Sequence, residues 1–251
     1  ASLQPYLSAV NAAHDDLGFQ KPALGHLVAR FRSGLAHLQN TAGRDAERVL
    51  LPAPIVQTAH DWALGLDLAS ASARQLSAFR AAVATVLNYC FFARGATGSA
   101  LCCGDVRRTD DALHITLARE KGKAKNQRSR VLSMPLGSVR GLDDLLKKWE
   151  LFRGACADSE SFFVLPAERS AATKLRPIRF ASTSIDRWVH EILDHLDLQP
   201  PPGDKWSGHS ERKGAASAAA AIGVRRNRIC WCGGWSIQSS TVHDYIDPTC
   251  P

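Results

Sequence analysis

The sequence predicts a mainly helical fold that carries a small antiparallel β-sheet. Apolar residues recur at helical spacing over long segments such as 71–91, and polar breaks separate these segments. Two short runs of apolar and β-branched residues, 114–117 and 131–134, flank a basic loop as the strands of a hairpin do. The chain is 45% hydrophobic, which suffices for a packed core and is too much for a disordered chain.

The first 48 residues are predicted to form a small helical unit of their own. Apolar residues recur at helical spacing over about 3–17, where Gly18 ends the helix, and again over about 23–38. Asn40–Arg48 is polar and is interpreted as a linker. The chain is therefore divided into residues 1–48 and a larger domain over 49–251.

The larger domain is expected to begin with a helix and to end in helices. Pro52 and Pro54 suit the first turn of a helix that runs through Trp62. Further helices are expected at 141–152 and from about 183 onward.

One more short strand and one break complete the prediction. Phe162–Leu165 is a candidate third strand, since it is a short apolar run that a proline follows. Pro200–Gly203 interrupts the helical pattern before the last helices.

Charge and composition restrict the classes of binding partner that are expected. The net charge is +7 and the isoelectric point is about 9.2, which favours a polyanionic partner such as nucleic acid, although many soluble proteins are mildly basic. No run of about 18 apolar residues is present, so no membrane span is expected. We expect an intracellular protein, in the nucleus if it is eukaryotic and otherwise in the cytoplasm or nucleoid.

The seven cysteines show no spacing typical of a disulfide framework, and reduced thiols are expected. Cys230 and Cys232, with His243 nearby, are half of a zinc site at most, because a second ligand pair is missing. No metal and no cofactor are therefore expected.

The segment from residue 208 to Tyr245 carries the strongest functional signal. His209 and Arg212 are three residues apart and share a helix face, where both can donate to phosphate oxygens. Trp235 follows two glycines and offers an indole N–H. The hydroxyl group of Tyr245 can attack phosphorus and hold a covalent intermediate.

This order of residues resembles the catalytic domain of the tyrosine recombinases, the family of phage integrases and Xer-type recombinases. That family has another arginine and a lysine upstream, and Arg94 and Lys121 match them in order. All six expected positions are filled. The residues around His209 are more similar to those of recombinases of eukaryotic mobile elements, of the DIRS or Crypton type, than to those of bacterial Xer proteins. The resemblance covers about residues 50–247, and the first 40 residues resemble part of the family's helical core-binding domain.

The resemblance implies a role for each residue. Tyr245 is the nucleophile, Arg94 and Arg212 clamp the phosphate, and His209 accepts a proton or donates to the phosphate. Lys121 is the general acid for the leaving 5′ oxygen, with Lys123 as second choice. Trp235 replaces the usual histidine and positions the phosphate, with a core role as the alternative. Basic residues expected to bind DNA are Lys123, Lys125, Arg128 and Arg130 in the hairpin loop and Arg30 near the N-terminus.

The resemblance also implies double-stranded DNA as substrate, a homo-tetramer on two DNA sites, and no need for metal or ATP. Two features depart from the family: Thr97 stands where an acidic residue is usual, and Tyr245 lies ten residues after Trp235, one more than in many relatives. The alternatives are a type IB topoisomerase with the same chemistry, and a DNA-binding protein that keeps the fold without catalysis.

Overall fold

The computed structural model describes residues 47–117, 130–171, 180–181, 183–238 and 240–246, together with Asp16. The chain forms two compact units, Ala1–Glu47 and Arg48–Pro251. The helices expected at 3–17 and 23–38, and Arg30 with them, lie outside the described residues. The assignment of residues 1–48 to a DNA-binding unit therefore stays a prediction.

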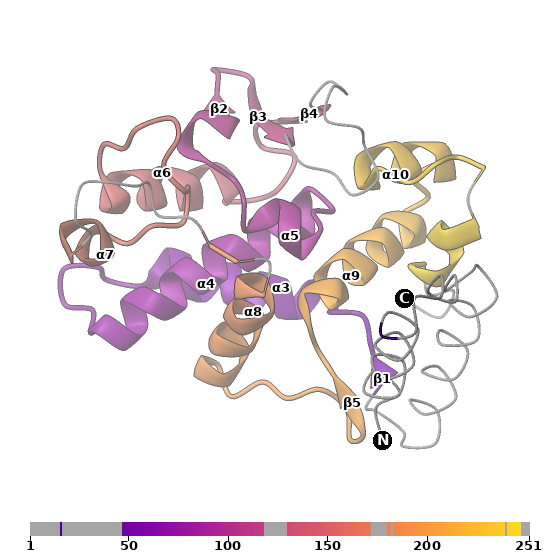
Figure 1. The fold of residues 1–251 in the computed structure, drawn as a ribbon, viewed down its shortest axis with the longest axis horizontal. Coiled ribbons are helices and arrows are strands. Elements are labelled where there is room, and N and C mark those ends of the chain that lie inside the picture. The colour runs from indigo at the N-terminus through magenta and orange to yellow at the C-terminus, as the bar shows by residue number, and fades with distance from the viewer. Residues whose placement is uncertain are drawn as a thin grey trace. The chain divides into compact units, whose positions relative to one another are not determined.

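Helices build most of the second unit, and α4 (Ala73–Cys90) runs through its middle (Figure 1). It begins with a capping box, in which the Ser72 hydroxyl accepts from the Gln75 backbone N–H while the Gln75 side chain accepts from that of Ser72. Every residue from Ala78 to Asn88 is buried, because other helices cover α4 on several sides. These are α3 (Ala53–Gly65), α6 (Leu142–Arg153), α8 (Ser184–His195) and α9 (Gly208–Ala221).

These bounds agree with the helices expected from the two prolines, from 71–91, from 141–152 and beyond 183. Among the described residues, no helix combines the length and the apolar character needed to cross a bilayer.

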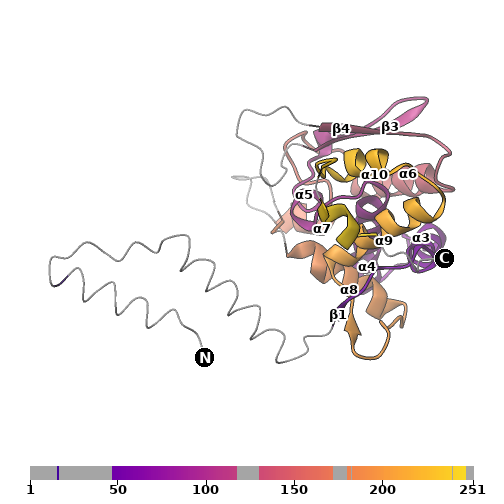
Figure 2. The ribbon, with the colours of Figure 1, turned by 90° about the vertical axis from the view of Figure 1, so that its right-hand side faces the viewer.

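A three-stranded antiparallel sheet in the order β2-β3-β4 lies at one end of the unit (Figures 1 and 2). The strands are β2 (Val106–Arg108), β3 (Ala112–Leu117) and β4 (Arg130–Pro135). Ile115 pairs with Leu132 on one side and with Val106 on the other, and all three side chains are buried. The predicted hairpin is thus confirmed, and the prediction of a mainly helical fold with a small antiparallel sheet is confirmed with it.

The strand expected at Phe162–Leu165 is wrong. Only an isolated bridge between Cys102 and Ser161 forms there, and Phe162 and Phe163 lie in a turn. Their rings are buried against Trp149 and its neighbours, and the Trp149 indole N–H donates to the Phe162 carbonyl at 3.1 Å. The apolar run therefore fills part of the hydrophobic core without forming a strand. In so few residues, periodicity cannot distinguish a strand from a buried turn.

The expectation of reduced thiols is also wrong for one pair, since Cys103 and Cys156 form a disulfide. Two backbone hydrogen bonds bring the segments together: the Cys103 N–H donates to Glu160 at 2.8 Å and the Gly104 N–H to Asp158 at 3.0 Å. Spacing along the sequence could not reveal this pairing, because the two cysteines are 53 residues apart.

Short elements complete the unit and carry much of the candidate site. They are β1 (Glu47–Arg48), which pairs with β5 (Asp204–Lys205), α5 (Gly95–Gly98), the 3₁₀ turn η1 (Cys103–Asp105), α7 (Pro166–Ala171), α10 (Arg226–Gly233) and the 3₁₀ turn η2 (Ser240–Asp244). The strands β1 and β5 are too short for the sequence pattern to have predicted them.

The described residues of the unit form two apolar cores. The larger surrounds α4, and a smaller one lies among α9, α10 and η2. The buried members of the smaller core are Ala216, Ile229, Cys230, Trp235 and Val242. Tyr245 and Phe92 pack against it, so this second core carries the aromatic side of the candidate site.

Candidate active site

Helix α9 places His209 and Arg212, and its first turn is held in two ways. The Ser207 hydroxyl accepts from the His209 N–H at 3.3 Å, which is an N-cap. The Gly208 N–H donates to the Asp186 carboxylate of α8 at 2.5 Å. His209 is exposed in this turn, whereas Arg212, one turn further on, is 1% exposed.

The Arg212 guanidinium group is enclosed by backbone carbonyls and aromatic rings. Nη1 donates to the Phe92 carbonyl at 2.5 Å, and Nη2 donates to the Gly233 carbonyl. The centre of the guanidinium lies 3.8 Å from the centroid of the Trp235 ring and 5.5 Å from that of Tyr245. Both are cation–π contacts, which are strongest when the cation is removed from water, as it is here.

Trp235 reaches this position because α10 ends tightly. Gly234 has φ +66° and closes the helix, and the Trp235 N–H donates to the Cys230 carbonyl at 2.9 Å. A Cβ atom on Gly233 would lie 1.8 Å from the indole ring. The glycine pair that precedes the tryptophan is thus required by close packing and by the left-handed backbone.

Tyr245 follows η2 directly and completes the cluster. Its carbonyl accepts from the Ser217 hydroxyl of α9 at 3.2 Å. Its ring centroid lies 5.0 Å from that of Trp235 and 6.4 Å from that of His209. Four of the six predicted catalytic residues, His209, Arg212, Trp235 and Tyr245, therefore meet in one place.

Arg94 is half-buried and occupies the N-cap position of α5. It lies two residues after Phe92, whose carbonyl accepts from Arg212, so a short stretch of backbone connects the two arginines. Within the described part of the chain, no hydrogen bond or ion pair engages the Arg94 guanidinium. Thr97, at the position where an acid is usual, is buried.

The structure does not describe the hairpin loop of the predicted site. Lys121 and the loop residues Lys123, Lys125 and Arg128 lie outside the described residues. Arg130, at the start of β4, is described, and its Nη1 donates to the carbonyls of Trp231 and, at 2.8 Å, Cys232. Arg130 therefore stabilises the C-terminal end of α10, where a cation is favourable.

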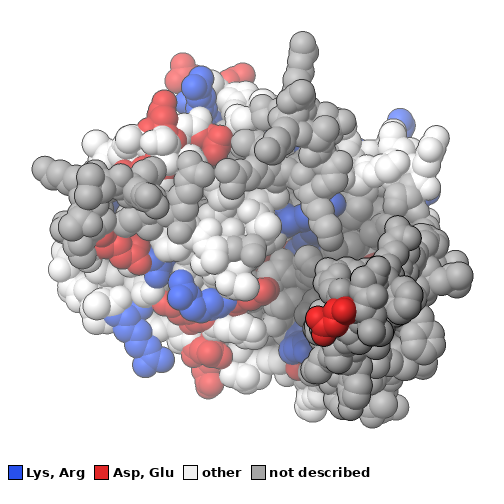
Figure 3. Space-filling model, viewed as in Figure 1, with Lys and Arg blue, Asp and Glu red and all other residues white. Residues whose placement is uncertain are grey.

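Basic residues outnumber acidic ones in the segment that carries the cluster. The sequence contains no Asp or Glu between Glu211 and Asp244, while Arg212, Lys213, Arg225, Arg226 and Arg228 lie in that stretch. Figure 3 shows acidic and basic side chains interspersed over α4 and α8, whereas the coloured atoms over α10 are basic. In the described residues, no group of three His, Cys, Asp or Glu side chains could hold a metal ion.

Glu211 belongs to the site and was missed by the sequence argument. It is fully buried beside Arg212, and burial raises the pKa of its carboxyl group well above the ordinary value. Thr85 and Asn88 of α4 act in the opposite direction, and Asp186 of α8 raises the pKa further. The position of a glutamate on the inward face of a predicted helix is the sequence feature that could have indicated a buried carboxyl group here.

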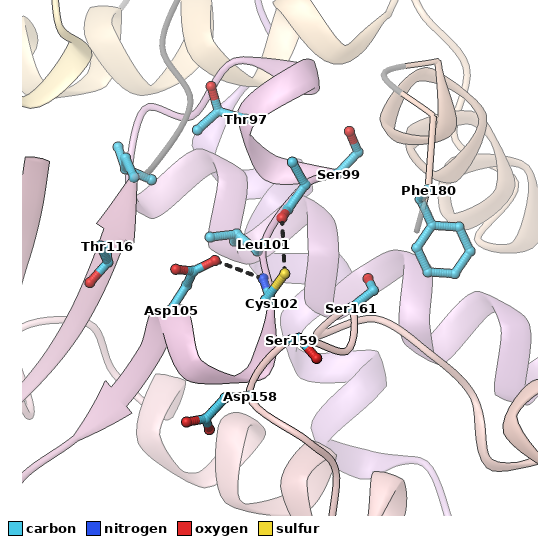
Figure 4. Close-up of a pocket in the computed structure, with 12 residues that line it drawn as sticks. Thr97, Ser99, Leu101, Cys102, Asp105, Thr116, Asp158, Ser159, Ser161 and Phe180 are labelled. Carbon is cyan, nitrogen blue, oxygen red and sulfur yellow. Dashed lines mark hydrogen bonds between the residues drawn. The ribbon is translucent and has the colours of Figure 1, made fainter. Parts of the chain in front are cut away.

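A separate cavity of about 410 Å³ lies between η1, β3 and the loop that contains Ser161 (Figure 4). Hydroxyl groups and two carboxylates, Asp105 and Asp158, line much of it. The Asp105 carboxylate is already engaged, since it accepts from the Cys102 N–H at 2.9 Å. None of the five predicted catalytic residues that the structure describes lines this cavity, so we do not place it in the active site.

The sequence matches no protein-family profile, and no curated protein matches it. Solved structures do match the fold. The XerH site-specific recombinase bound to its difH substrate in a pre-cleavage complex superposes with a TM-score of 0.56 and 13% identity, over 81% of this chain and 52% of that one. This chain thus spans about half the length of the XerH chain.

Two further structures match over nearly the whole chain. The XerA recombinase has a TM-score of 0.54 and 16% identity, over 98% of this chain and 72% of that one. Lambda integrase residues 75–356, in a dimer bound to a COC′ core site, matches with a TM-score of 0.54 and 14% identity. The match covers 97% of this chain and 79% of that one.

Proposed function

Because the chain has the fold of the tyrosine recombinases, we propose that it cleaves and rejoins DNA strands through a covalent link between Tyr245 and a DNA 3′ phosphate. The observation that carries the proposal is the cluster in which a buried arginine, an indole and an imidazole surround one phenol ring. A packed tyrosine alone would not require these neighbours, and each of them can serve phosphoryl transfer.

The reaction needs positive donors on the two non-bridging oxygens, where charge grows in the transition state. Arg212 and Arg94 supply these donors, and the Trp235 indole N–H adds a neutral one. An arginine pair provides the charge that other phosphoryl-transfer enzymes obtain from metal ions.

The proton steps complete the proposal. The Tyr245 hydroxyl oxygen bonds to phosphorus as the bond from phosphorus to the 5′ oxygen breaks. His209 accepts the phenol proton, and Lys121 donates a proton to the leaving 5′ oxygen. A 5′ hydroxyl from a partner duplex then reverses each step, and the covalent link conserves the bond energy.

The burial of Arg212 constrains when this happens. Its side chain is 1% exposed beneath Trp235 and Tyr245, so a phosphate reaches it only after these rings move. We therefore assign the described arrangement to the state before DNA binds. Binding of duplex DNA would supply the free energy for the rearrangement, since it releases counterions from the phosphates.

For the assembly, we propose a homo-tetramer on two DNA sites, because four strands must be cut in one exchange. For the biological setting, we propose recombination of a mobile element, which rests on the resemblance of the His209 segment to the DIRS and Crypton types.

One observation favours a second candidate, a DNA-binding protein without catalysis. Arg212 Nη1 and Nη2 donate to the backbone carbonyl groups of Phe92 and Gly233, as a structural arginine does. In that case the guanidinium would stay enclosed when DNA binds.

Covalent trapping tests the proposal against this alternative. The protein is mixed in EDTA with nicked duplexes that carry candidate element termini, beside Tyr245→Phe. We expect an SDS-resistant adduct that is absent from the variant. Clear duplex binding by gel shift with no adduct on any substrate would contradict catalysis and favour the second candidate.

A further inference from the structure

Glu211 lies at the centre of a buried polar cluster between α9 and α4. Its side chain is fully buried, and Thr85 and Asn88 of α4 are among the polar side chains that act on its carboxyl group. These two are 1% exposed, and neither they nor the carboxyl oxygens reach well-formed hydrogen-bond geometry with a described residue. A buried polar group without a hydrogen-bond partner costs stability, so its presence calls for an explanation.

The surroundings favour the protonated form of Glu211. Burial raises the pKa of its carboxyl group and Asp186 of α8 raises it further, and together these effects outweigh the Thr85 and Asn88 side chains of α4, which lower it. The neighbouring Arg212 directs its donors to backbone carbonyls instead. A protonated carboxyl group can donate a hydrogen bond to the Asn88 amide oxygen, which a carboxylate cannot do.

Asn88 also supports the helix that Arg94 caps. A Cβ atom on Gly98 of α5 would lie 1.9 Å from the Asn88 amide oxygen, so α5 rests directly on this side chain. The Asn88 carbonyl accepts from the Ala93 N–H at 2.9 Å, immediately before Arg94. One residue of α4 therefore contacts the segments that carry both arginines.

We propose that Glu211 and Asn88 are positioning residues: Glu211 and the Asn88 amide, packed together in this buried cluster, fix α5 against α9, so that Arg94 and Arg212 face the same phosphate. The proposal rests on the proposed function and extends it, because neither residue touches the reacting atoms. This role would explain why the Glu211 carboxyl group is buried beside Arg212, the cation proposed to bind the phosphate.

The first experiment compares Glu211→Gln, Glu211→Leu and Asn88→Ala with wild type, and uses Ser184→Ala as a buried control on α8. The rate of adduct formation per folded molecule is measured at saturating nicked duplex, and the dissociation constant is measured separately. We expect rates at least tenfold lower for Glu211→Leu and Asn88→Ala, with dissociation constants within threefold of wild type. Glu211→Gln, which keeps shape and neutrality, should retain the rate.

Dependence on pH separates positioning from a general effect on folding. Wild type should lose rate relative to Glu211→Gln as pH rises toward 9, because only the glutamate can ionise. Rates that follow the folded fraction alone, or Glu211→Leu and Asn88→Ala rates equal to wild type, would overturn the proposal.

A second measurement needs no strand cleavage. Orthovanadate, a phosphate analogue, is titrated by calorimetry into each folded protein bound to a duplex that lacks the scissile phosphate, because the rings over Arg212 are expected to move only when DNA binds. Binding by wild type and Glu211→Gln, weakened at least tenfold in Glu211→Leu and Asn88→Ala, supports positioning even if no adduct forms, in which case the proposed function alone fails. Equal binding by all variants, or none by wild type, overturns the positioning role.

Discussion

The Arg212 guanidinium lies 3.8 Å from the centroid of the Trp235 ring, and its two terminal nitrogens donate to the carbonyls of Phe92 and Gly233. Phe92 ends the turn after α4, and Gly233 ends α10. The residue proposed to bind the phosphate thus also joins three segments of the fold. Its replacement should affect stability and activity together.

We expect Arg212→Gln to lower the free energy of unfolding by about 3 kcal/mol, because two charge-assisted hydrogen bonds are lost or weakened. Adduct formation should fall below detection. Urea denaturation measures the first effect, and Tyr245→Phe is the control, since it keeps the ring and removes only the hydroxyl group. Unchanged stability of Arg212→Gln would show that the enclosed arrangement does not persist in solution.

Gly233→Ala should disrupt the aromatic side of the site. The new methyl group would lie 1.8 Å from the Trp235 ring, so the indole must move away from Arg212. We expect a loss of about 1–3 kcal/mol, as for other overpacked sites, and a change in tryptophan fluorescence. Gly65→Ala is the matched control, because nothing lies within 4 Å of a Cβ there. Equal thermal stability of the two variants would contradict this packing.

The role of Lys121 can be tested through the leaving group. Lys121→Ala should abolish cleavage of an ordinary duplex, since the 5′ oxygen then leaves unprotonated. A substrate with sulfur in place of that 5′ oxygen needs no proton, and it should restore cleavage at least tenfold. Lys123→Ala should need no such rescue. Rescue of Lys123→Ala alone would transfer the role to Lys123.

Glu211 predicts how stability depends on pH. Its folded pKa lies above the unfolded value, so its contribution is fully present below the unfolded pKa and is lost as pH rises through the folded one. Wild type should therefore lose stability relative to Glu211→Gln from about pH 4 upward, where free glutamate ionises. Urea midpoints of both proteins between pH 4 and pH 9 provide the measurement. Parallel curves would mean that Glu211 ionises normally.

Much of the fold could be predicted from local pattern. Helix α4 has its capping box and a long apolar face in sequence, and the hairpin of β3 and β4 alternates as strands do. The turn at Phe162 and Phe163 could not be predicted, because a short apolar run is compatible with a strand or with a plug for the core. Its conformation depends on Trp149, which is distant in sequence.

The candidate site was predictable in part for the same reason. The order of His209, Arg212, Trp235 and Tyr245 predicts the four residues on which the proposed chemistry rests, and the structure brings these four together. Burial of Glu211 against α4 depends on how two helices pack, which one sequence does not state. The catalytic role of Lys121 stays a prediction, since it lies outside the described residues.

The hydrogen bond from Ser217 to the Tyr245 carbonyl has a consequence for how copies cooperate. It ties Tyr245 to the helix that carries Arg212, within a single polypeptide. Under the proposed function, we expect each protomer to attack the strand that its own arginine holds. A mixture of protomers lacking Arg212 and protomers lacking the Tyr245 hydroxyl should then form no covalent adduct.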